Sequence, residues 1–277
     1  MGYIDAHVHV WTDDTQAYPL APGFSAAHMK PATFAPEELL AHANPCGVDR
    51  IVLIQMSYYG FDNSYMLDTM RRFPGVFGGV AVIDHEADGA EDEMARLRGV
   101  GVRGLRVQPG PAAAADWLSA GDWPRLLGLA GDLGIAVCAL IDPGFLPAVG
   151  RAAQRFPQTT FVIDHLARIG CGRPIMEADI EALCALAAQS NCLVKVSAFY
   201  ALGAKTPPHD DLIALIRKAH AAFGADRLMW ATDCPFQVQD ETYEDSLSLV
   251  RDRLDFVSEA DRAAVLGQTA QRVFFAQ

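Results

Sequence analysis

Two histidines near the start of the chain, His7 and His9, are separated by one residue and are the first candidates for chemistry. They lie in the segment 4–11, where polar and apolar residues alternate. Side chains two positions apart in a strand point to the same face, so both histidines are predicted to share a face with Asp5. Imidazoles on a buried face need partners, and a divalent metal provides one because neutral histidine nitrogens coordinate zinc at about 2.0–2.1 Å. A hydrogen-bonded histidine pair without chemistry is the alternative.

Two further candidates, His165 and Asp233, each stand where a predicted strand ends. His165 comes just after the apolar run 161–163, and Asp233 follows the run 228–232. Taken singly, each could be a helix cap or a turn residue. In one parallel barrel, however, the carboxyl ends of all strands meet at a single face. Together with the two histidines of the first strand, these residues predict a four-ligand metal site that is open to water or substrate.

The elements that must position these residues alternate between short β-branched runs and helical patterns. Pro36 marks the first turn of one helical pattern, and Asn63 and Asp122 precede two others. Gly134 marks the end of the pattern after Asp122, and Gly224 marks the end of a later one. The predicted strands are residues 3–9, 50–56, 76–83, 102–107, 135–141, 160–164, 192–197 and 227–232.

Eight strand-helix units in a chain of this length predict an α/β fold of the (β/α)8 TIM-barrel type. Runs such as 135–141 are apolar on both faces, as strands of a buried parallel sheet must be. A doubly wound open sheet is the alternative. No shift in composition marks a second domain, so residues 1–277 are expected to form one domain. The irregular segment 11–35 is predicted to be a long loop that forms part of a lid.

Composition limits the classes of function. The chain has 277 residues, and 22 basic against 34 acidic side chains give a net charge of −12. This acidic balance, without a basic run, argues against nucleic acid or an anionic membrane surface as partner. No apolar run reaches the roughly 18 residues of a membrane span, and no secretion signal opens the chain, so a cytoplasmic protein is expected. The six cysteines form no C-x-x-C pair and are expected to be reduced thiols.

A glycine pattern at residues 99–104 matches G-x-G-x-x-G but does not predict dinucleotide binding. A helical pattern precedes it and a strand follows, whereas phosphate binding needs the strand first and the helix last. The sequence also contains no phosphate-binding P-loop motif, no G-x-S-x-G and no H-E-x-x-H. Nucleotide hydrolysis, serine-hydrolase chemistry and zincin-type proteolysis therefore lack support.

Several motifs in order resemble the amidohydrolase superfamily, in its amidohydrolase-related branch. They are the Asp-x-His-x-His of the first strand and the segments 52–63, 101–106, 163–168, 194–197 and 231–235. Within that branch the chain looks like the lactonases that act on 2-pyrone dicarboxylates and on sugar lactones. The resemblance runs over essentially the whole chain.

The resemblance implies a site and a cofactor. His7, His9, His165 and Asp233 match the metal-binding or catalytic cluster, in which Asp233 is the general base and His165 is also catalytic. The branch uses one metal or sometimes none, and Arg106 stands on the fourth strand in place of a Lys or Glu that could bridge two ions. One divalent ion is therefore expected, zinc first and manganese as the alternative.

The resemblance also implies substrate contacts. Arg106 and Arg168 stand where the lactonases bind anionic groups. Gln55 and Tyr59, at the end of the second strand, are candidates for hydrogen bonds to substrate, and Tyr59 is equally a candidate for lid packing.

Lys195 is predicted to point inward, in a structural ion pair with Asp5 or, as the alternative, as a catalytic or substrate-binding lysine. The chain departs from the dicarboxylate lactonases at Ala201, where they carry an arginine, and at Phe236, where they carry a histidine.

These observations predict a hydrolase that opens a small lactone or related cyclic ester by attack of water, with a small molecule as substrate. A homo-oligomer is left open. The runner-up is a metal-dependent decarboxylase of a small aromatic or unsaturated carboxylic acid. Those decarboxylases place a further histidine on the strand after the third ligand, where this chain has Lys195 and Ser197. A barrel that binds a ligand without catalysis is the third alternative, but all four ligand positions are filled.

Overall fold

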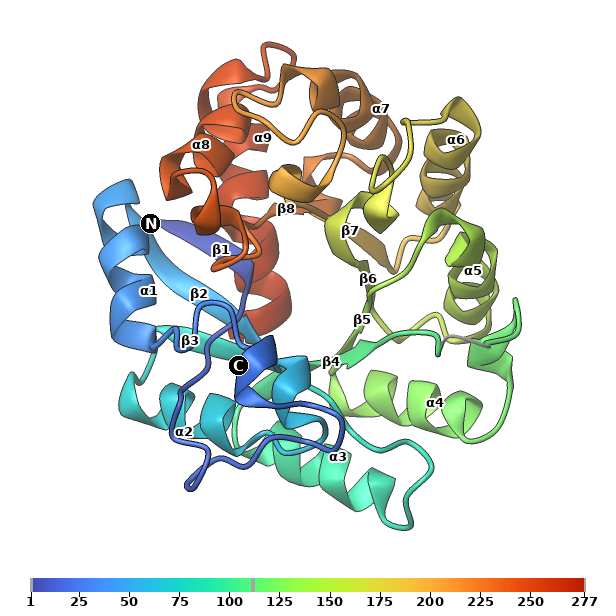
Figure 1. Ribbon diagram of the computed structural model, residues 1–277. Helices are drawn as coiled ribbons and strands as arrows, with labels where there is room; N and C mark the ends of the chain where they lie inside the picture. The colour runs from blue at the N-terminus through green and yellow to red at the C-terminus, as the bar shows by residue number, and fades with distance from the viewer. Residues whose placement is uncertain (1, 111–112, 277) are drawn as a thin grey trace.

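A single sheet of eight parallel strands forms the centre of the molecule in the computed structural model, which describes residues 2–110 and 113–276. The other four residues of the expected 1–277 domain lie outside that description. Each strand pairs with the next one along the chain, and the helices surround the strands in chain order (Figure 1). The strands are β1 (Tyr3–Val8), β2 (Val48–Ile54), β3 (Phe77–Ala81), β4 (Val102–Val107), β5 (Ala136–Ala139), β6 (Phe161–Ile163), β7 (Cys192–Val196) and β8 (Leu228–Trp230).

The barrel is closed where the chain after β8 meets β1. The backbone N–H of Asp233 donates to the carbonyl of His7 at 2.9 Å, and the N–H of His9 donates to the carbonyl of Cys234 at 2.8 Å. An open doubly wound sheet would leave these groups at two separate edges. The (β/α)8 TIM barrel predicted from the sequence is therefore confirmed, and the open-sheet alternative is wrong.

The helices begin close to where the sequence places them. Pro36 is the first residue of α1, and Asp122 directly precedes α4. Asn63 precedes α2 as predicted, but its side chain makes no cap. Its amide donates to the carbonyl of Val82 at 2.9 Å and accepts from the N–H of Val82 at 3.0 Å. The α-helices are α1 (Pro36–Ala43), α2 (Ser64–Arg72), α3 (Ala90–Gly99), α4 (Trp123–Leu133), α5 (Leu146–Arg155), α6 (Glu177–Ala185), α7 (Ile213–Phe223), α8 (Tyr243–Ser248) and α9 (Glu259–Ala263).

Two apolar clusters make up the core. The larger one lies between the strands and the surrounding helices. The smaller one joins inward side chains of different strands, among them Val80, Val162 and Met229, with Phe274 of the C-terminal segment. The interior of the barrel is thus apolar near the amino ends of the strands, and the polar side chains gather toward the carboxyl ends.

The first strand contains an irregularity that the alternation of its sequence does not predict. Ile4 and Ala6 belong to the apolar cluster inside the barrel, whereas Asp5 contacts Tyr243 of α8 on the outside. The register of β1 shifts between Asp5 and Val8, as at a β-bulge. The shift brings His7 inward although Ala6 before it also points inward. The expectation that Asp5 shares the face of the two histidines is therefore wrong.

The segment after β1 crosses the near side of the barrel in Figure 1, in dark blue. Trp11 and Phe34 form an isolated antiparallel bridge that closes this segment into a loop. The hydroxyl of Tyr58 donates to the carbonyl of His28 and ties the loop to the end of β2. No helix in the described parts of the chain is long and apolar enough to cross a membrane. All six cysteines are free, as expected.

Candidate active site

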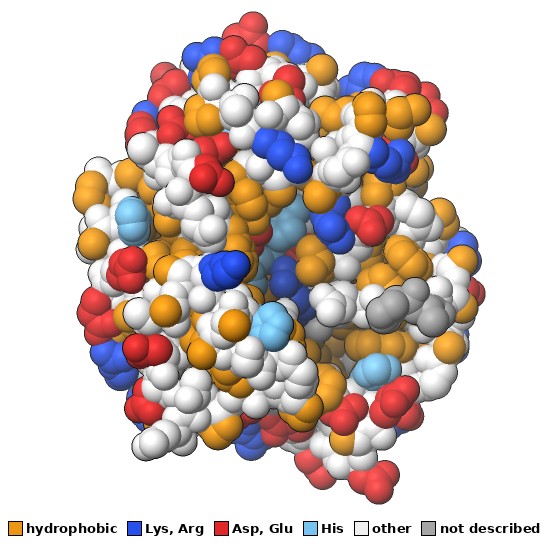
Figure 2. Space-filling view, viewed as in Figure 1, with side chains coloured by type: hydrophobic (Ala, Val, Ile, Leu, Met, Phe, Trp, Pro, Cys, Tyr) orange, Lys and Arg blue, Asp and Glu red, His pale blue; other side chains and the backbone are white. Residues whose placement is uncertain are grey.

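A cavity of about 330 Å³ opens at the carboxyl ends of the strands, on the face where active sites of TIM barrels lie. Figure 2 shows the hollow near the centre of this face, with histidine and basic side chains inside it. The lining residues are His9, Met56, Ser57, Arg106, Leu140, His165, Arg168, Cys171, Ala198, Tyr200, Ala201, Leu202, Asp233 and Phe236.

Three of the four expected metal ligands converge at the floor of the cavity. One donor atom each from His7, His165 and Asp233 lies within 4.8 Å of the other two. The fourth, His9, is not a member of that group, but its Nε2 lies 3.3 Å from Oδ1 of Asp233. The structure thus brings the three histidines around the carboxylate of Asp233.

The Asp233 carboxylate is held by one oxygen and left open at the other. Its Oδ2 accepts a hydrogen bond from the hydroxyl of Tyr200 at 2.7 Å. Its Oδ1 is buried and has no hydrogen-bond partner among the described residues. Burial by itself would raise the pKa of Asp233, but its attraction to His165 and its contact with His9 outweigh burial and hold that pKa below its ordinary value. The carboxylate is therefore ionised at neutral pH, with one oxygen facing the imidazoles.

Contacts on the far side of each ring orient the histidines. Nδ1 of His9 lies 2.9 Å from the carbonyl of Ile54, which can only accept, so this nitrogen carries the hydrogen. Nε2 of His9 then faces Oδ1 of Asp233. Nδ1 of His165 lies 2.9 Å from the hydroxyl of Ser197. Burial lowers the pKa of His165 to about 4, so this ring is neutral.

A buried network of charges lies beneath His7. Asp164 forms ion pairs with Lys195 at 3.0 Å and with Arg106 at 3.2 Å. The same two cations approach the two nitrogens of His7: Lys195 lies 3.2 Å from Nδ1 and Arg106 lies 3.0 Å from Nε2. Burial, followed by repulsion from Lys195, lowers the pKa of His7 well below its usual range. His7 is therefore held as a neutral ring between two positive charges.

Lys195 pairs with Asp164, and the predicted pair with Asp5 is wrong. Lys195 points inward from β7 as expected, but the irregularity in β1 turns Asp5 to the outside. The Lys195 side chain is fully buried and does not line the cavity. Its contacts place it under His7, where it positions the ring.

The two predicted arginines both line the cavity. Arg106 extends from β4, and its side chain is only 9% exposed. Arg168 follows β6 in a turn in which four consecutive residues, 165–168, have positive φ angles. This left-handed backbone is strained for residues other than glycine and is a feature that clusters at functional sites. Here it directs both His165 and Arg168 to the cavity.

Gln55 and Tyr59 do not reach the cavity. The side-chain amide of Gln55 is buried and donates to the carbonyl of Asp62 at 2.5 Å. The hydroxyl of Tyr59 accepts from the N–H of Thr12 at 3.0 Å and so fastens the loop after β1. Both residues hold loops in place, and the structure gives neither a free group toward a substrate. Of the two roles weighed for Tyr59, the contacts favour lid packing.

The chain is similar to known proteins over nearly its whole length. The family model described as Amidohydrolase matches residues 4–276. The chain belongs to the amidohydrolase family. Among relatives, an L-fucono-1,5-lactonase of Burkholderia ambifaria is 33% identical over 84% of this chain and 80% of the relative. A 2-pyrone-4,6-dicarboxylate hydrolase of Comamonas testosteroni is 26% identical over 89% of this chain and 81% of its own length.

The fold is also similar to that of solved structures of such hydrolases. A Pseudomonas putida structure assigned to the 2-pyrone-4,6-dicarboxylic acid hydrolases superposes with a TM-score of 0.82 at 26% identity, covering 99% of this chain and 97% of that one. The likeness predicted from the motifs of the sequence is thus confirmed, and this amidohydrolase is a hydrolase by its family.

The donor set of this amidohydrolase fits a divalent cation. Oδ1 of Asp233 has no partner in the described chain, and two histidine Nε2 atoms lie 3.3 and 3.4 Å from it. Nδ1 of His9 donates to a carbonyl, which orients its Nε2 toward a carboxylate oxygen, as an outer hydrogen bond orients a histidine ligand of a metal. The residues that would hold the cation are His7, His165 and Asp233, with His9 beside them. A cation would compete with Arg106 for Nε2 of His7.

Sequence reasoning missed three functional candidates in this amidohydrolase. Asp164 stands beside His165 in the segment 163–168, but its ion pairs with Arg106 of β4 and Lys195 of β7 are visible only in the folded barrel. Ser197 and Tyr200 likewise follow Lys195 closely, and their contacts with His165 and Asp233 depend on the closure of the sheet. Ser197 is the last residue of a predicted strand and Tyr200 follows it closely, and this position at the strand end was the available signal.

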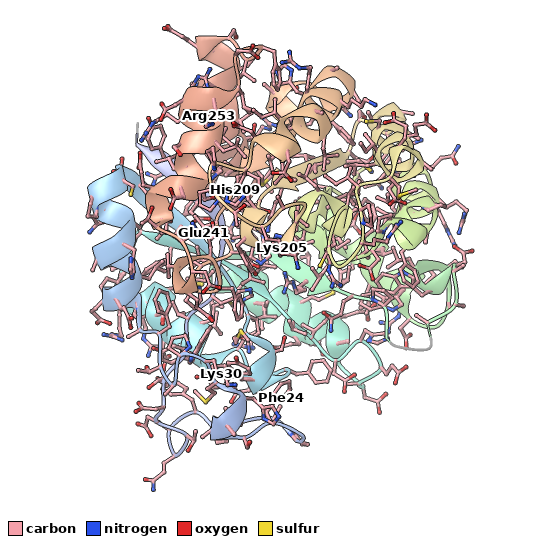
Figure 3. All side chains as sticks on the ribbon, turned by 45° about the horizontal axis from the view of Figure 1, so that its top comes forward. Phe24, Lys30, Lys205, His209, Glu241 and Arg253 are labelled. Atoms are coloured by element: carbon pink, nitrogen blue, oxygen red, sulfur yellow. The ribbon has the colours of Figure 1, made fainter. Side chains whose placement is uncertain are left out.

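A buried pair joins the two loops nearest to Asp233 and Tyr200. Nε2 of His209, in the loop after β7, lies 3.0 Å from a carboxylate oxygen of Glu241, in the loop after β8. Figure 3 shows the two labelled side chains close together above the barrel. Their contact holds the loop that carries Tyr200 against the loop that carries Phe236.

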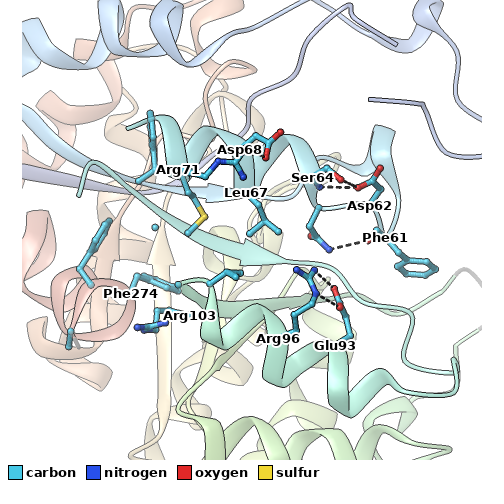
Figure 4. A pocket seen from close by; sticks show the side chains of 18 residues that line it. Phe61, Asp62, Ser64, Leu67, Asp68, Arg71, Glu93, Arg96, Arg103 and Phe274 are labelled. Carbon is cyan, nitrogen blue, oxygen red and sulfur yellow. Dashed lines mark hydrogen bonds and ion pairs between the residues drawn. The ribbon is translucent and has the colours of Figure 1, made fainter. Parts of the chain in front are cut away.

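A larger groove, of about 790 Å³, lies on the side of the barrel between α2 and α3 (Figure 4). Its lining includes the exposed Phe61 and Val100 but no histidine. Its acidic residues include Asp68 and Glu93, which are neutralised by neighbouring arginines at 2.8 and 2.7 Å. The convergent unpaired polar groups lie in the smaller cavity, which is therefore the candidate active site.

Proposed function

We propose that this amidohydrolase opens a small lactone or related cyclic ester by attack of water, with Asp233 as the general base. The observation that carries the proposal is the unpaired Oδ1 of Asp233, which is buried at the floor of the cavity and faces Nε2 of both His7 and His9. An ionised carboxylate in reach of a cavity can accept a proton from water as that water attacks a carbonyl carbon. Two relatives that act on lactones by name support this reading.

Tyr200 and Asp233 have different roles in the proposed reaction. Tyr200 donates to Oδ2 of Asp233 and so keeps Oδ1 aimed at the water. Oδ1 takes one proton as the water oxygen bonds to the carbonyl carbon. When the bond between that carbon and the ring oxygen breaks, the same proton passes to the ring oxygen. The product is an open hydroxy acid, and Asp233 is again ionised.

The site suits one divalent cation, with zinc as the first choice and manganese as the alternative, because its donors are imidazole nitrogens and a carboxylate. When bound, such a cation polarises the carbonyl and lowers the pKa of water. The chain contributes the orientation. Ser197 fixes the ring of His165, and the carbonyl of Ile54 fixes the ring of His9. Arg106 and Arg168 supply guanidinium donors to the substrate.

Product analysis tests the proposal. The purified protein, with its metal content measured, is incubated with a panel of γ- and δ-lactones, and acid release is followed together with mass spectrometry of the products. We expect a gain of one water and release of one acid equivalent. Release of carbon dioxide from an aromatic or unsaturated acid, without ring opening, would establish decarboxylation instead. Absence of turnover on every ester and acid, in protein of full metal content, would favour a barrel that only binds.

A further inference from the structure

We propose that the cavity selects lactones that carry a single carboxylate on an otherwise hydrocarbon ring. The inference rests on the proposed function and adds the chemical class of its substrate. The observation that carries it is the division of the cavity wall into two opposite sectors. One sector has positive charge, and the other, apart from the reacting groups His9 and Asp233 and the hydroxyl of Ser57, is apolar.

The positive sector belongs to β4, β5 and β6. Arg106 comes from β4 and Arg168 from the turn after β6, and both line the cavity. The Arg106 side chain is more than nine-tenths buried, and its Nε has no hydrogen-bond partner within the described residues. The guanidinium of Arg168 lies 3.3 Å from the exposed carboxylate of Asp142 and 3.8 Å from the sulfur of Cys171. A carboxylate here would meet two guanidinium groups, and a guanidinium group binds a carboxylate in a planar, bidentate geometry.

The apolar sector lies across the barrel, at β2 and β8. Met56 follows β2 and Phe236 follows β8, and both line the cavity. Because neighbours in this closed sheet follow chain order, β8, β1 and β2 stand opposite β4, β5 and β6. The centroid of the Phe236 ring lies 5.9 Å from that of the Trp11 ring and 5.7 Å from that of the His9 ring. These contacts hold Phe236 in the cavity wall.

The wall next to this sector, after β7, is also apolar at its rim. Ala201 and Leu202 line it with short or hydrocarbon side chains. Tyr200 also lines the cavity, but its hydroxyl donates to the carboxylate of Asp233. Ser57 and Cys171 are the remaining polar side chains in the lining, apart from the charged groups and histidines already described.

A second carboxylate on the substrate would therefore lose its water in a sector that offers the hydroxyl of Ser57 but no positively charged side chain, and it would approach the negative Asp233. Both effects are costly in a partly enclosed site. The hydroxyls of a sugar lactone would meet the same wall. A hydrocarbon edge, by contrast, gains from leaving water. A cavity of about 330 Å³ is at the small end for ligand sites, which suits a five- or six-membered ring with one substituent. The inferred class differs from the substrates named for both relatives.

The proposed substrate class can be tested with a series of compounds that share one lactone ring and carry no, one or two carboxylates. The probes are 2-pyrone, 2-pyrone-6-carboxylate and 2-pyrone-4,6-dicarboxylate, with L-fucono-1,5-lactone as the neutral polyol, and kcat/KM is measured for each. We expect the monocarboxylate to exceed the other three by at least about 10-fold, the size of one charged hydrogen bond. Equal or higher values for the dicarboxylate or the sugar lactone would overturn the inference and leave lactone hydrolysis intact.

Binding measurements distinguish a failure of the proposed hydrolase function from a failure of the inferred substrate class. If no probe is turned over, the proposed function fails, and calorimetric titration of the same four compounds into the protein still decides the class. Tightest binding of the monocarboxylate supports the inference. Tighter binding of the dicarboxylate or of the polyol, or equal binding of all four, contradicts it.

Two substitutions test whether the positive and apolar sectors of the cavity determine the substrate class. Arg168→Met should lower kcat/KM for the monocarboxylate by on the order of 10- to 100-fold more than it lowers kcat/KM for unsubstituted 2-pyrone. Arg173→Met is the matched control, because Arg173 lies nearby in the chain but does not line the cavity and pairs with Asp179. Ala201→Arg adds a positive group after β7 and should raise kcat/KM for the dicarboxylate relative to the monocarboxylate.

Circular dichroism and melting temperature establish that each variant is folded. A loss in Arg168→Met that is the same for the charged and the neutral pyrone would show that Arg168 supports the fold of the site and does not bind the carboxylate. An Ala201→Arg variant that folds but leaves the ratio of dicarboxylate to monocarboxylate unchanged would likewise count against the apolar sector as the determinant.

Discussion

Two aspartates lie at the seam where β1 meets the end of β8, and their surroundings differ sharply. Asp5 points outward and accepts four hydrogen bonds. The N–H and hydroxyl of Thr232 donate at 3.0 and 2.5 Å, the hydroxyl of Tyr243 at 2.6 Å, and the N–H of His7 at 3.1 Å. Asp233 points inward, accepts one hydroxyl at 2.7 Å, and keeps one oxygen without a donor.

The difference separates a structural carboxylate from a reactive one. Buried polar groups in folded proteins are nearly always paired, because an unpaired one costs on the order of 1–3 kcal/mol. Asp5 follows that rule and joins two strands and α8 at the closure of the barrel. Asp233 departs from it at the floor of a cavity, where a substrate, a water or a cation can pair with the free oxygen. The four predictions below test this contrast.

Replacement of Asp233 should have the largest effect on activity. Asp233→Asn removes the proton acceptor and keeps the shape of the side chain, so kcat should fall by on the order of 10³-fold. Steady-state kinetics on any lactone that is turned over measures the effect, and the melting temperature should stay close to that of the wild type. Activity of the Asn variant within 10-fold of the wild type would remove Asp233 from the role of base.

Replacement of Asp5 should act on stability. Asp5→Ala leaves the buried hydroxyls of Thr232 and Tyr243 without their acceptor, so the free energy of unfolding should fall by roughly 3 kcal/mol or more. Urea unfolding followed by tryptophan fluorescence measures this. The part of the variant that remains folded should keep kcat within a few-fold of the wild type. A loss of kcat as large as that of Asp233→Asn, in folded protein, would contradict the division of roles.

The pH dependence of the free energy of unfolding should also reveal the protonation of Asp5. Burial raises the pKa of Asp5 to about 6, although its hydrogen bonds to Thr232 and Tyr243 act in the opposite direction. An acid whose pKa is higher in the folded state binds its proton more tightly there. Its contribution to stability is therefore complete below about pH 4 and is lost as the pH rises through about 6, by up to about 3 kcal/mol.

The comparison that isolates this contribution uses Asp5→Asn, which is neutral at every pH. Unfolding free energies of both proteins are measured in urea at several values between pH 4 and pH 7. The wild type should lose stability relative to the Asn variant as the pH rises. A difference between the two proteins that is constant over this range would show that Asp5 does not titrate there.

Tyr200 should have the smallest of these effects. Tyr200→Phe removes the one hydrogen bond to Oδ2 of Asp233 and keeps the ring, so kcat should fall by about 10-fold, the equivalent of about 1.4 kcal/mol. Tyr58→Phe is the control, because its hydroxyl donates to a loop carbonyl outside the cavity. If both variants lose the same activity, Tyr200 acts through loop structure and not through the carboxylate.

Much of the barrel could be predicted from the sequence because its strands are local patterns. The predicted run 76–83 contains β3 (Phe77–Ala81), and the run 227–232 contains β8 (Leu228–Trp230). The predicted runs are longer because the residues beyond each strand are still apolar or β-branched, although they no longer pair. His165 and Asp233 stand past strand ends for the same local reason, and one parallel sheet then brings them to one face.

The candidate site itself was only partly predictable. The residue types of the convergent cluster could be chosen from the sequence, but the partners of Lys195 and Gln55 could not. Lys195 meets Asp164 from the neighbouring strand β6, and Gln55 donates to a carbonyl of its own loop. Both contacts depend on register and on loop course, which the alternation of side chains does not encode.

The amino-acid sequence by itself determined the number and order of the strands, the residue types at their ends and the family, because these follow from short-range periodicity and from motifs. Only the tertiary structure decided which carboxylate is reactive. The shift of register in β1 turns Asp5 outward into four hydrogen bonds, and closure of the barrel brings Asp233 inward with one oxygen unpaired. The two residues are the same amino acid, and their roles differ because hydrogen-bond donors reach one of them fully and the other by a single hydroxyl.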